Sequence, residues 1–215
     1  MSNYAIFTNM QKKSLVFYPV PKNANSSAKY FLIKHCGLED KFKTPKDLNN
    51  VNQISINNNL SKDDKIKPTI SSFIPSKQKF ARVDADFKAC ILRDPINRFI
   101  SAYTNRVLYR KDPGFFEHSV DMVIEKLKEG KFENKHFLPQ TYFLGKNLSY
   151  FNIICCMNSL NVFENEINSF FNNNIKFPWV ETQSSSLDLS KKQLSDLNYI
   201  YEEDLKLFQD YIISK

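Results

Sequence analysis

Two short apolar segments of this chain each run through a polar turn directly into an amphipathic helix. Residues 14–20 read SLVFYPV and precede a helix expected over 25–36, while residues 87–92 read FKACIL and precede a second helix. Short buried runs that alternate with helical periodicity are typical of strand–helix units in a mostly parallel sheet. The sequence therefore predicts an α/β fold with helices on both faces of that sheet.

The later elements continue this alternation within one domain. Apolar periodicity predicts a third strand and three more helices: helix 117–130, strand 150–157, helix 161–172 and one final helix 190–213. A chain of 215 residues suits a single domain, 1–215, with one core. Residues 40–80 are rich in Asn, Ser, Lys and Pro, and predict a loop-rich insertion into that domain.

The charge balance favours an anionic ligand. Lys and Arg outnumber Asp and Glu by 30 to 23, a formal charge of +7. The lysines are scattered and the arginines crowd into residues 82–110, unlike the basic and aromatic stripe of a nucleic-acid surface, so no nucleic-acid partner is expected. No stretch approaches the roughly 20 apolar residues of a membrane span. The four cysteines lack metal-ligand spacing and indicate buried thiols, so we expect a soluble, cytoplasmic protein.

The first turn, residues 21–27, contains no glycine, yet it lies where a strand gives way to a helix. Ligands of parallel sheets bind outside the carboxyl ends of the strands, where such turns gather. The free N–H groups and the positive dipole end of the helix suit an anion. Lys22 adds a point charge, and Ser26 and Ser27 add hydroxyl donors. The turn is predicted to hold a doubly charged oxyanion.

The second turn, residues 93–101, offers another anion site. Asp94 is a good N-cap for the helix that follows, whose predicted polar face carries Arg98 and Ser101. Arg93 at the strand end and Ser101 two helical turns later lie within reach of one phosphate, which a guanidinium can hold with paired donors. Two separate anion sites suit a nucleotide that carries charge at both ends.

Together the two turns resemble the paired signatures of sulfotransferases that use 3′-phosphoadenosine 5′-phosphosulfate (PAPS). VPKNANSS is similar to the family's Pro-Lys-x-x-x-(Ser/Thr)-(Ser/Thr) loop for the 5′-phosphosulfate, and ILRDPINRFISAY to its turn and helix for the 3′-phosphate. Family loops often carry Thr-Gly or Thr-Ala where this chain has Asn and Ala. The resemblance assigns the 3′-phosphate to Arg93 and Ser101. It assigns the 5′ end to the loop residues Lys22, Asn23, Ala24, Asn25, Ser26 and Ser27.

Two further segments resemble the carbohydrate-sulfotransferase branch. KHFLPQ, residues 135–140, is similar to its His-aromatic-x-Pro-Gln segment, and LNYIYEEDLKLF, residues 197–208, to its closing helix with Tyr-x-x-Asp. The resemblance implies a P-loop-kinase-like three-layer sandwich and a soluble, bacterial-type enzyme that needs no bound metal. Its implied reaction moves the sulfuryl group of PAPS to a hydroxyl of a carbohydrate or other small acceptor, and releases 3′-phosphoadenosine 5′-phosphate (PAP).

This reaction needs a cation for the leaving phosphate and a base for the acceptor hydroxyl. By the same resemblance Lys22 is expected to stabilise the leaving group and His136 to take the proton. A structural role for His136 stays open, as does a carboxylate base such as Asp84 or Asp86. The polar loop before the last helix supplies further candidates for nucleotide contacts, namely Trp179, Thr182, Ser184 and Ser185.

Two other functional classes stay open at this point. A P-loop nucleotide kinase would share the sheet, but it would need a glycine-rich loop and a metal-binding acidic residue. A non-catalytic module could keep the nucleotide site alone. The acceptor is expected to be a glycan or small-molecule hydroxyl, with a weak preference for an acidic one, and the sequence predicts no oligomeric state.

Overall fold

The computed structural model describes most of the chain outside the predicted insertion. The described residues are 4–8, 11–39, 80, 82–115, 117–178 and 186–213. The insertion predicted at 40–80 therefore lies outside them, apart from Phe80. Trp179, Thr182, Ser184 and Ser185 lie outside them too.

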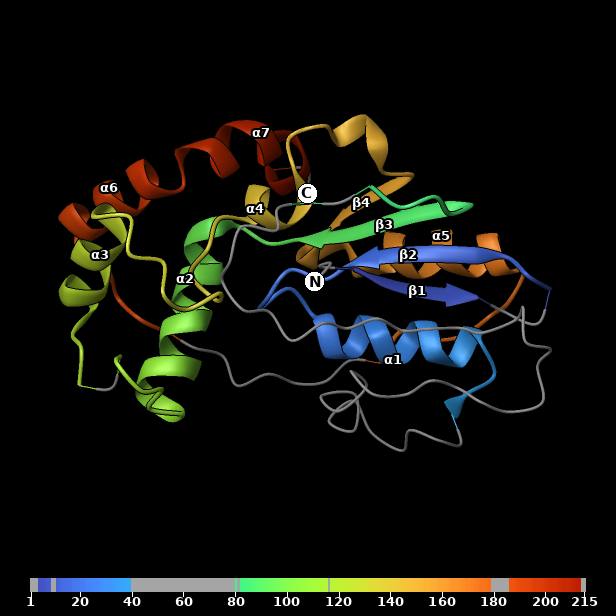
Figure 1. Cartoon of the computed structure of the whole chain (residues 1–215), viewed down its shortest axis with the longest axis horizontal. Helices are drawn as coiled ribbons and strands as arrows, with labels where there is room; N and C mark the ends of the chain where they lie inside the picture. The colour runs from blue at the N-terminus through green and yellow to red at the C-terminus, as the bar shows by residue number, and fades with distance from the viewer. Residues whose placement is uncertain are drawn as a thin grey trace.

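The core of the structure is an open sheet with strand order β1-β2-β3-β4 (Figure 1). Its strands are β1 (Ala5–Thr8), β2 (Ser14–Tyr18), β3 (Phe87–Leu92) and β4 (Ile153–Cys156). Strands β2, β3 and β4 are parallel, and β1 pairs antiparallel with β2. The three parallel strands confirm the predicted ones, whereas β1 is too short for its periodicity to stand out in the sequence.

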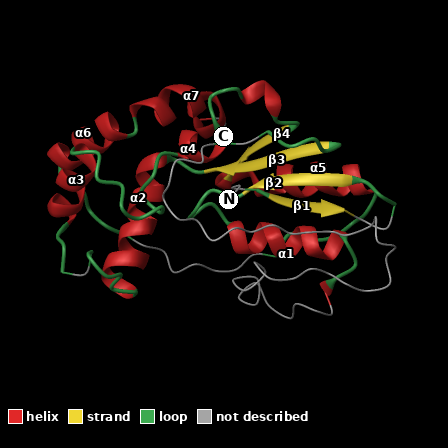
Figure 2. Cartoon of the chain, in the orientation of Figure 1, coloured by secondary structure: helices red, strands yellow, loops and turns green. Residues whose placement is uncertain are grey.

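Helices cover both faces of the sheet, as Figure 2 shows. Helices α1 (Asn25–His35) and α5 (Leu160–Phe171) pack on the face formed by Leu15, Phe17 and Ile91. Helices α4 (Gln140–Leu144) and α7 (Glu202–Ile213) pack on the opposite face. Side chains of successive strand residues point to opposite faces, so both sides of the strands are apolar. The predicted α/β fold with helices on both faces is confirmed.

A third apolar cluster lies beyond the carboxyl ends of the strands. It joins α2 (Pro95–Tyr103), the π-helix η3 (Thr104–Tyr109), α3 (Val120–Lys128) and α6 (Lys191–Ile200). Short 3-10 turns, η4 (Leu148–Tyr150) and η5 (Met157–Ser159), flank β4. None of the helices among the described residues has the length and apolar character needed to cross a bilayer.

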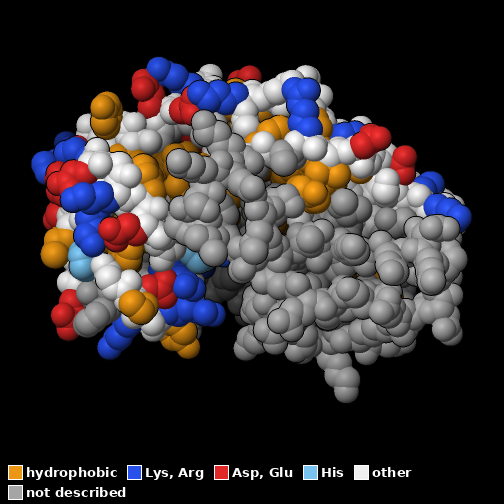
Figure 3. Space-filling view, viewed as in Figure 1, with side chains coloured by type: hydrophobic (Ala, Val, Ile, Leu, Met, Phe, Trp, Pro, Cys, Tyr) orange, Lys and Arg blue, Asp and Glu red, His pale blue; other side chains and the backbone are white. Residues whose placement is uncertain are grey.

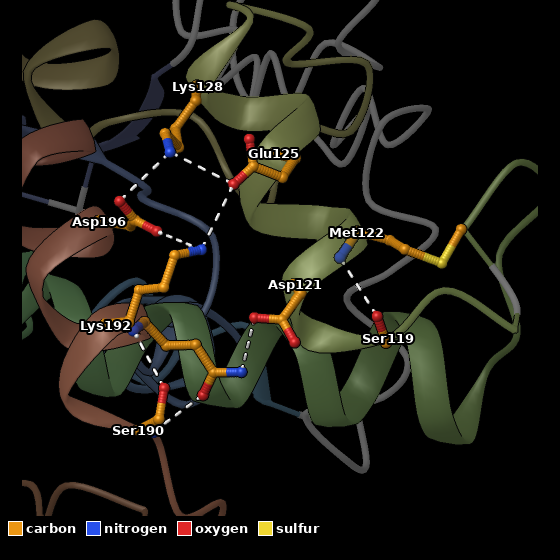
Figure 4. Close-up of polar contacts among 9 residues, drawn as sticks. Ser119, Asp121, Met122, Glu125, Lys128, Ser190, Lys192 and Asp196 are labelled. Carbon is orange, nitrogen blue, oxygen red and sulfur yellow. Dashed lines mark hydrogen bonds and ion pairs between the residues drawn. The ribbon is translucent and has the colours of Figure 1, made fainter.

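Polar contacts line the outer edge of the seam between α3 and α6 (Figure 4). The Lys128 ammonium lies 3.3 Å from the Asp196 carboxylate, and the Gln193 amide donates to Asp121 at 2.9 Å. Such surface ion pairs contribute little to stability. The seam is therefore held mainly by the buried residues between the two helices, including Val123 and Leu197.

The predicted single helix over 190–213 is wrong in one respect. The chain turns at Tyr201, which separates α6 from α7. The Tyr201 ring is buried, and its hydroxyl donates to the carbonyl of Phe137 at 2.8 Å. The break therefore lies at a side chain that is fixed to Phe137, a contact that amphipathic periodicity alone does not reveal.

Arg98 corrects a second prediction, because it lies in the core and not on an exposed polar face. Its side chain is 0% exposed. The guanidinium donates to the carbonyls of Pro21 at 3.4 Å and His136 at 3.1 Å, and also to the carbonyl of Leu138. The Tyr201 ring lies 5.8 Å from it. Arg98 thus joins the first turn to the segment that carries His136.

We expect Arg98→Lys to lower the free energy of unfolding by about 2 kcal/mol, because a single ammonium cannot reach three carbonyl groups that a guanidinium serves together. Urea denaturation measures the change. The exposed Arg110→Lys is the matched control and should change stability by less than about 0.5 kcal/mol. An Arg98→Lys variant as stable as the wild type would contradict this role.

Candidate functional site

The two predicted turns lie side by side at the carboxyl edge of the sheet. Tyr18 of β2 pairs with Cys90 of β3, so the two parallel strands end close together. The Arg93 guanidinium donates to the carbonyl of Lys22 at 3.2 Å. The strand–helix turns therefore form one continuous surface, as their order in the sequence predicts.

The first turn has a backbone shaped for an anion despite its lack of glycine. Lys22 and Ala24 have left-handed φ values of 73° and 51°, and Asn23 between them does not. Successive N–H groups in such an alternating segment converge on one point and bind anions. Ala24 carries a cost of about 1–2 kcal/mol for this conformation, which glycine would avoid. The turn therefore adopts, at a conformational cost, a backbone shape that glycine-rich loops adopt without that cost.

Helix α1 begins at this turn without a side-chain cap. Ala24 occupies its N-cap position, and the first turn contains no acidic residue. By contrast, α2, α3 and α6 are capped by the side chains of Asp94, Ser119 and Ser190. An uncapped helix start leaves N–H groups and the positive dipole end available to an external anion.

A buried amide bridge fixes both turns. The Asn23 side chain is 0% exposed and donates to the carbonyl of Ile91 at 2.8 Å and to Gln140 Oε1 at 2.7 Å. Gln140 Oε1 also accepts from the Arg93 N–H at 3.1 Å, and its Nε2 donates to the Arg93 carbonyl at 2.8 Å. The Asn23 side chain thus faces the protein interior and positions the loop.

Asp204 holds this bridge from the opposite side. Its carboxylate accepts from the backbone N–H groups of Gln140 at 2.6 Å and Thr141 at 2.9 Å, at the start of α4. Burial raises the pKa of Asp204, while the charge of Arg98 and these hydrogen bonds oppose the shift. Tyr201 and Asp204 form the Tyr-x-x-Asp pattern noted in the sequence, so that pattern indicates the residue that positions Gln140. Gln140 itself is predicted only as the last residue of KHFLPQ.

Lys22 lies in a strongly positive environment. Burial, followed by the charges of Arg93, Arg106 and Arg110, lowers its pKa to about 8. Lys29, one helical turn inside α1, also has a pKa of about 8, owing to burial and the charge of Lys135. Neither ammonium forms an ion pair with a residue that the structure describes.

The charged surface at the helical end of the molecule is mixed in sign. Over the helical end of the molecule in Figure 3, basic side chains are mixed with acidic ones. At the two turns, Arg93, Arg106 and Arg110 lie near enough to Lys22 to lower its pKa. Among the described residues no group of His, Cys, Asp and Glu is arranged to hold a metal ion. The site is suited to a multiply charged anion.

His136 lies at the same site. Burial has the largest effect on its pKa, which is lowered to about 3. The positive charges of Arg106, Lys135, Lys22 and Arg98 contribute to the same shift. Its Nδ1 lies 2.7 Å from Asn134 Oδ1. The ring is therefore neutral near pH 7 in the free protein, with a lone pair on one of its two nitrogens.

The remaining predicted residues differ in their burial and in their contacts with other described residues. Ser27 is buried, and Ser26, Asn25 and Ser101 are half-buried, with no side-chain hydrogen bond to another described residue. They stay predictions as nucleotide contacts. His35 is packed between Phe31 and Phe171, as expected for a core residue.

Asp84 and Asp86 are not placed to act as the base. Asp86 accepts from the Ser14 N–H and hydroxyl, both at 2.8 Å, and it directly precedes β3. The amino end of that strand lies about 20 Å from its carboxyl end. Asp84 is exposed two residues earlier. The structure thus places both carboxylates away from the two turns, and it does not support a carboxylate base at these positions.

We expect Lys22→Met to stabilise the free protein below pH 8, because burial and Arg93 disfavour the charged lysine in the folded state. Between about pH 8 and 10.5 the unfolded chain still binds a proton that the folded chain has released, so wild-type stability rises. The advantage of the variant should shrink across that window in urea denaturation. Exposed Lys191→Met controls for loss of charge. A difference that grows with pH would contradict the buried charge.

Comparison with known proteins assigns the chain to a family. Residues 6–211 match the model of the sulfotransferase family. Searches of curated proteins and of solved structures found no match. The matched segment includes both turns, His136 and most of the closing helices. The chain belongs to the sulfotransferase family.

Proposed function

We propose that this protein is a PAPS-dependent sulfotransferase of the EC 2.8.2 type, acting on a hydroxyl of a carbohydrate or other small acceptor. The observation that carries the proposal is the contact of Arg93 with the Lys22 carbonyl, because it joins two anion-binding turns into one site. The family match supports sulfuryl transfer in general. A P-loop-kinase-like architecture and a cytoplasmic location are parts of the same proposal.

The residues of the site fit such a donor. We assign the 5′-phosphosulfate to the loop residues 22–27, whose backbone and uncapped helix start offer N–H groups. We assign the 3′-phosphate to Arg93 and Ser101. Arg93 uses one N–H on the Lys22 carbonyl, and a guanidinium has five, so its capacity for a phosphate is largely intact.

In the proposed reaction, Lys22 stabilises the negative charge that develops on the departing 5′-phosphate. The acceptor oxygen forms a bond to sulfur as the bond between sulfur and the phosphate oxygen breaks. His136 Nε2 takes the proton of the acceptor hydroxyl. The PAPS anion would offset the charges of Lys22, Arg98 and Arg106 and so raise the pKa of His136, while the larger effect of burial would remain. The base would then be strongest when the donor is bound.

The charges around His136 support an acidic acceptor. Lys29 and Lys135 lie close enough for Lys135 to lower the pKa of Lys29, and neither has an ion-pair partner among the described residues. Two half-buried ammonium groups without a counter-ion favour an anionic group beside the reacting hydroxyl. We propose a glycan or small molecule that carries a carboxylate or sulfate.

Thermal-shift titration with PAP tests the donor site. PAP should raise the Tm of the wild type, and Arg93→Ala should remove most of that rise, because the 3′-phosphate loses its guanidinium. Arg82→Ala is the matched control, since Arg82 is exposed near the amino end of β3 and should leave the shift unchanged. An equal PAP shift for wild type and Arg93→Ala would contradict the assignment.

Transfer of labelled sulfate from PAPS tests the catalytic roles. His136→Gln should lower kcat by about 10²–10⁴-fold, the usual contribution of a general base, while the PAP thermal shift persists. His118→Gln should leave kcat unchanged. PAP binding without transfer to any acceptor in a broad carbohydrate panel would indicate a binding module. Phosphoryl transfer from ATP that a chelator abolishes would indicate a kinase.

A further inference from the structure

We propose that Asp112 and Asn134 are positioning residues that fix the tautomer of His136, with the proton on Nδ1 and a free lone pair on Nε2. The proposal rests on the proposed function, in which Nε2 takes the acceptor's proton. Four side chains carry it in series: Arg106, Asp112, Asn134 and His136. None of the first three was singled out as a site residue by the sequence.

The hydrogen bonds of Asp112 determine which way the Asn134 amide faces. Asp112 Oδ2 accepts from Arg106 Nε at 2.6 Å and from Asn134 Nδ2 at 2.8 Å. A carboxylate paired with a guanidinium can only accept hydrogen bonds. The amide nitrogen of Asn134 must therefore face Asp112, and its oxygen must face His136.

The next link determines the state of the imidazole. Asn134 Oδ1 accepts the backbone N–H of His136 at 3.0 Å and lies 2.7 Å from His136 Nδ1. Because an amide oxygen donates no proton, Nδ1 must carry one. In a neutral ring the lone pair then lies on Nε2.

The charges around the ring favour that neutral form. Arg106 comes from η3, Arg98 from α2, Lys22 from the first turn, and Lys135 precedes the histidine, and each disfavours a second proton. Asp112 is the acidic group of the series, but its hydrogen bonds go to Arg106 and Asn134. The ring is thus held neutral, and its hydrogen bond to Asn134 selects one of the two neutral tautomers.

The π-helix η3 gives this arrangement its geometry. Arg106 lies within η3, and the backbone N–H of Asp112 donates to the Arg106 carbonyl at 2.9 Å. Single π-turns are rare and occur frequently at functional sites. The turn that follows η3, in which Lys111 has a left-handed φ of 50°, brings Asp112 back beside Arg106, where one carboxylate oxygen accepts from both Arg106 and Asn134.

Asn134 also makes a local contact that can be purely structural, and its effect must be separated from the effect on the His136 tautomer. Its side chain also closes a local turn onto the backbone N–H two residues later, which stabilises loops without any effect on chemistry. Asn147 makes the same contact with the N–H of Ser149 at 3.2 Å, far from His136 in the chain. Asn147→Ala is therefore a matched control for loss of such a turn.

Long-range ¹H–¹⁵N NMR of the full chain with ¹⁵N-labelled histidine reads the tautomer directly. His136→Gln assigns the ring among the three histidines. At pH 7 we expect a protonated Nδ1 and a bare Nε2 in the wild type. Asn134→Ala should shift the ring toward the tautomer with the proton on Nε2, whereas Asn147→Ala should not. A wild-type ring protonated on Nε2 overturns the proposal, even if Asn134→Ala does not fold.

Kinetics supplies the second readout. Asn134→Ala should lower kcat by about 10-fold or more while the PAP thermal shift is unchanged, as for other groups that orient a catalytic histidine. Asp112→Asn keeps an oxygen that can accept both N–H groups and should retain the wild-type tautomer, whereas Asp112→Leu should lose it. An unchanged tautomer in Asn134→Ala or Asp112→Leu overturns the proposal. Absence of any PAP thermal shift in the wild type would instead count against the proposed function, and the NMR result would still decide the tautomer.

Discussion

The buried amide bridge between Asn23 and Gln140 is the interaction on which the site depends. It ties the first turn to the carbonyl of Ile91 in β3 and, through Gln140, to both backbone groups of Arg93. Unpaired amides in the core would each cost about 1–3 kcal/mol, so the partners specify one arrangement of the two turns. The separation of the two anion sites is consequently fixed by the core of the fold and not by flexible surface side chains.

A second consequence of this arrangement is electrostatic. The bridge holds Lys22 and Arg93 close together, and Arg98 is buried behind them with its donors on backbone carbonyls. Burial of Lys22 beside Arg93 is unfavourable in the free protein, as the lowered pKa of Lys22 records. A multiply charged anion recovers this energy on binding. Burial, together with the same positive charges, keeps His136 neutral, so a bound anion would change the strength of this base through its charge.

Much of this organisation can be predicted from the sequence, because local patterns determine it. The strand over Phe87–Leu92 and the Asp94 cap are local features, and the structure has both at the predicted residues. Arg98 could not be placed correctly, since helical periodicity assigns a charged residue to solvent and its buried carbonyl partners come from distant segments. The break at Tyr201 and the series from Arg106 to His136 likewise depend on contacts between remote parts of the chain. Asn134-x-His136 offered a weak signal of its own, as a side chain able to cap the histidine two residues later.

In the proposed site one nucleotide bridges both turns, with its 5′ end on the first and its 3′-phosphate on the second. Isothermal titration calorimetry with PAP and with adenosine 5′-monophosphate tests it most directly, in wild type and Arg93→Ala. We expect PAP to bind the wild type about 10- to 100-fold more tightly than the monophosphate, because the extra phosphate forms charged hydrogen bonds. Arg93→Ala should remove this difference without weakening the monophosphate. Equal affinities for the two nucleotides in the wild type, or equal losses for both in Arg93→Ala, would contradict it.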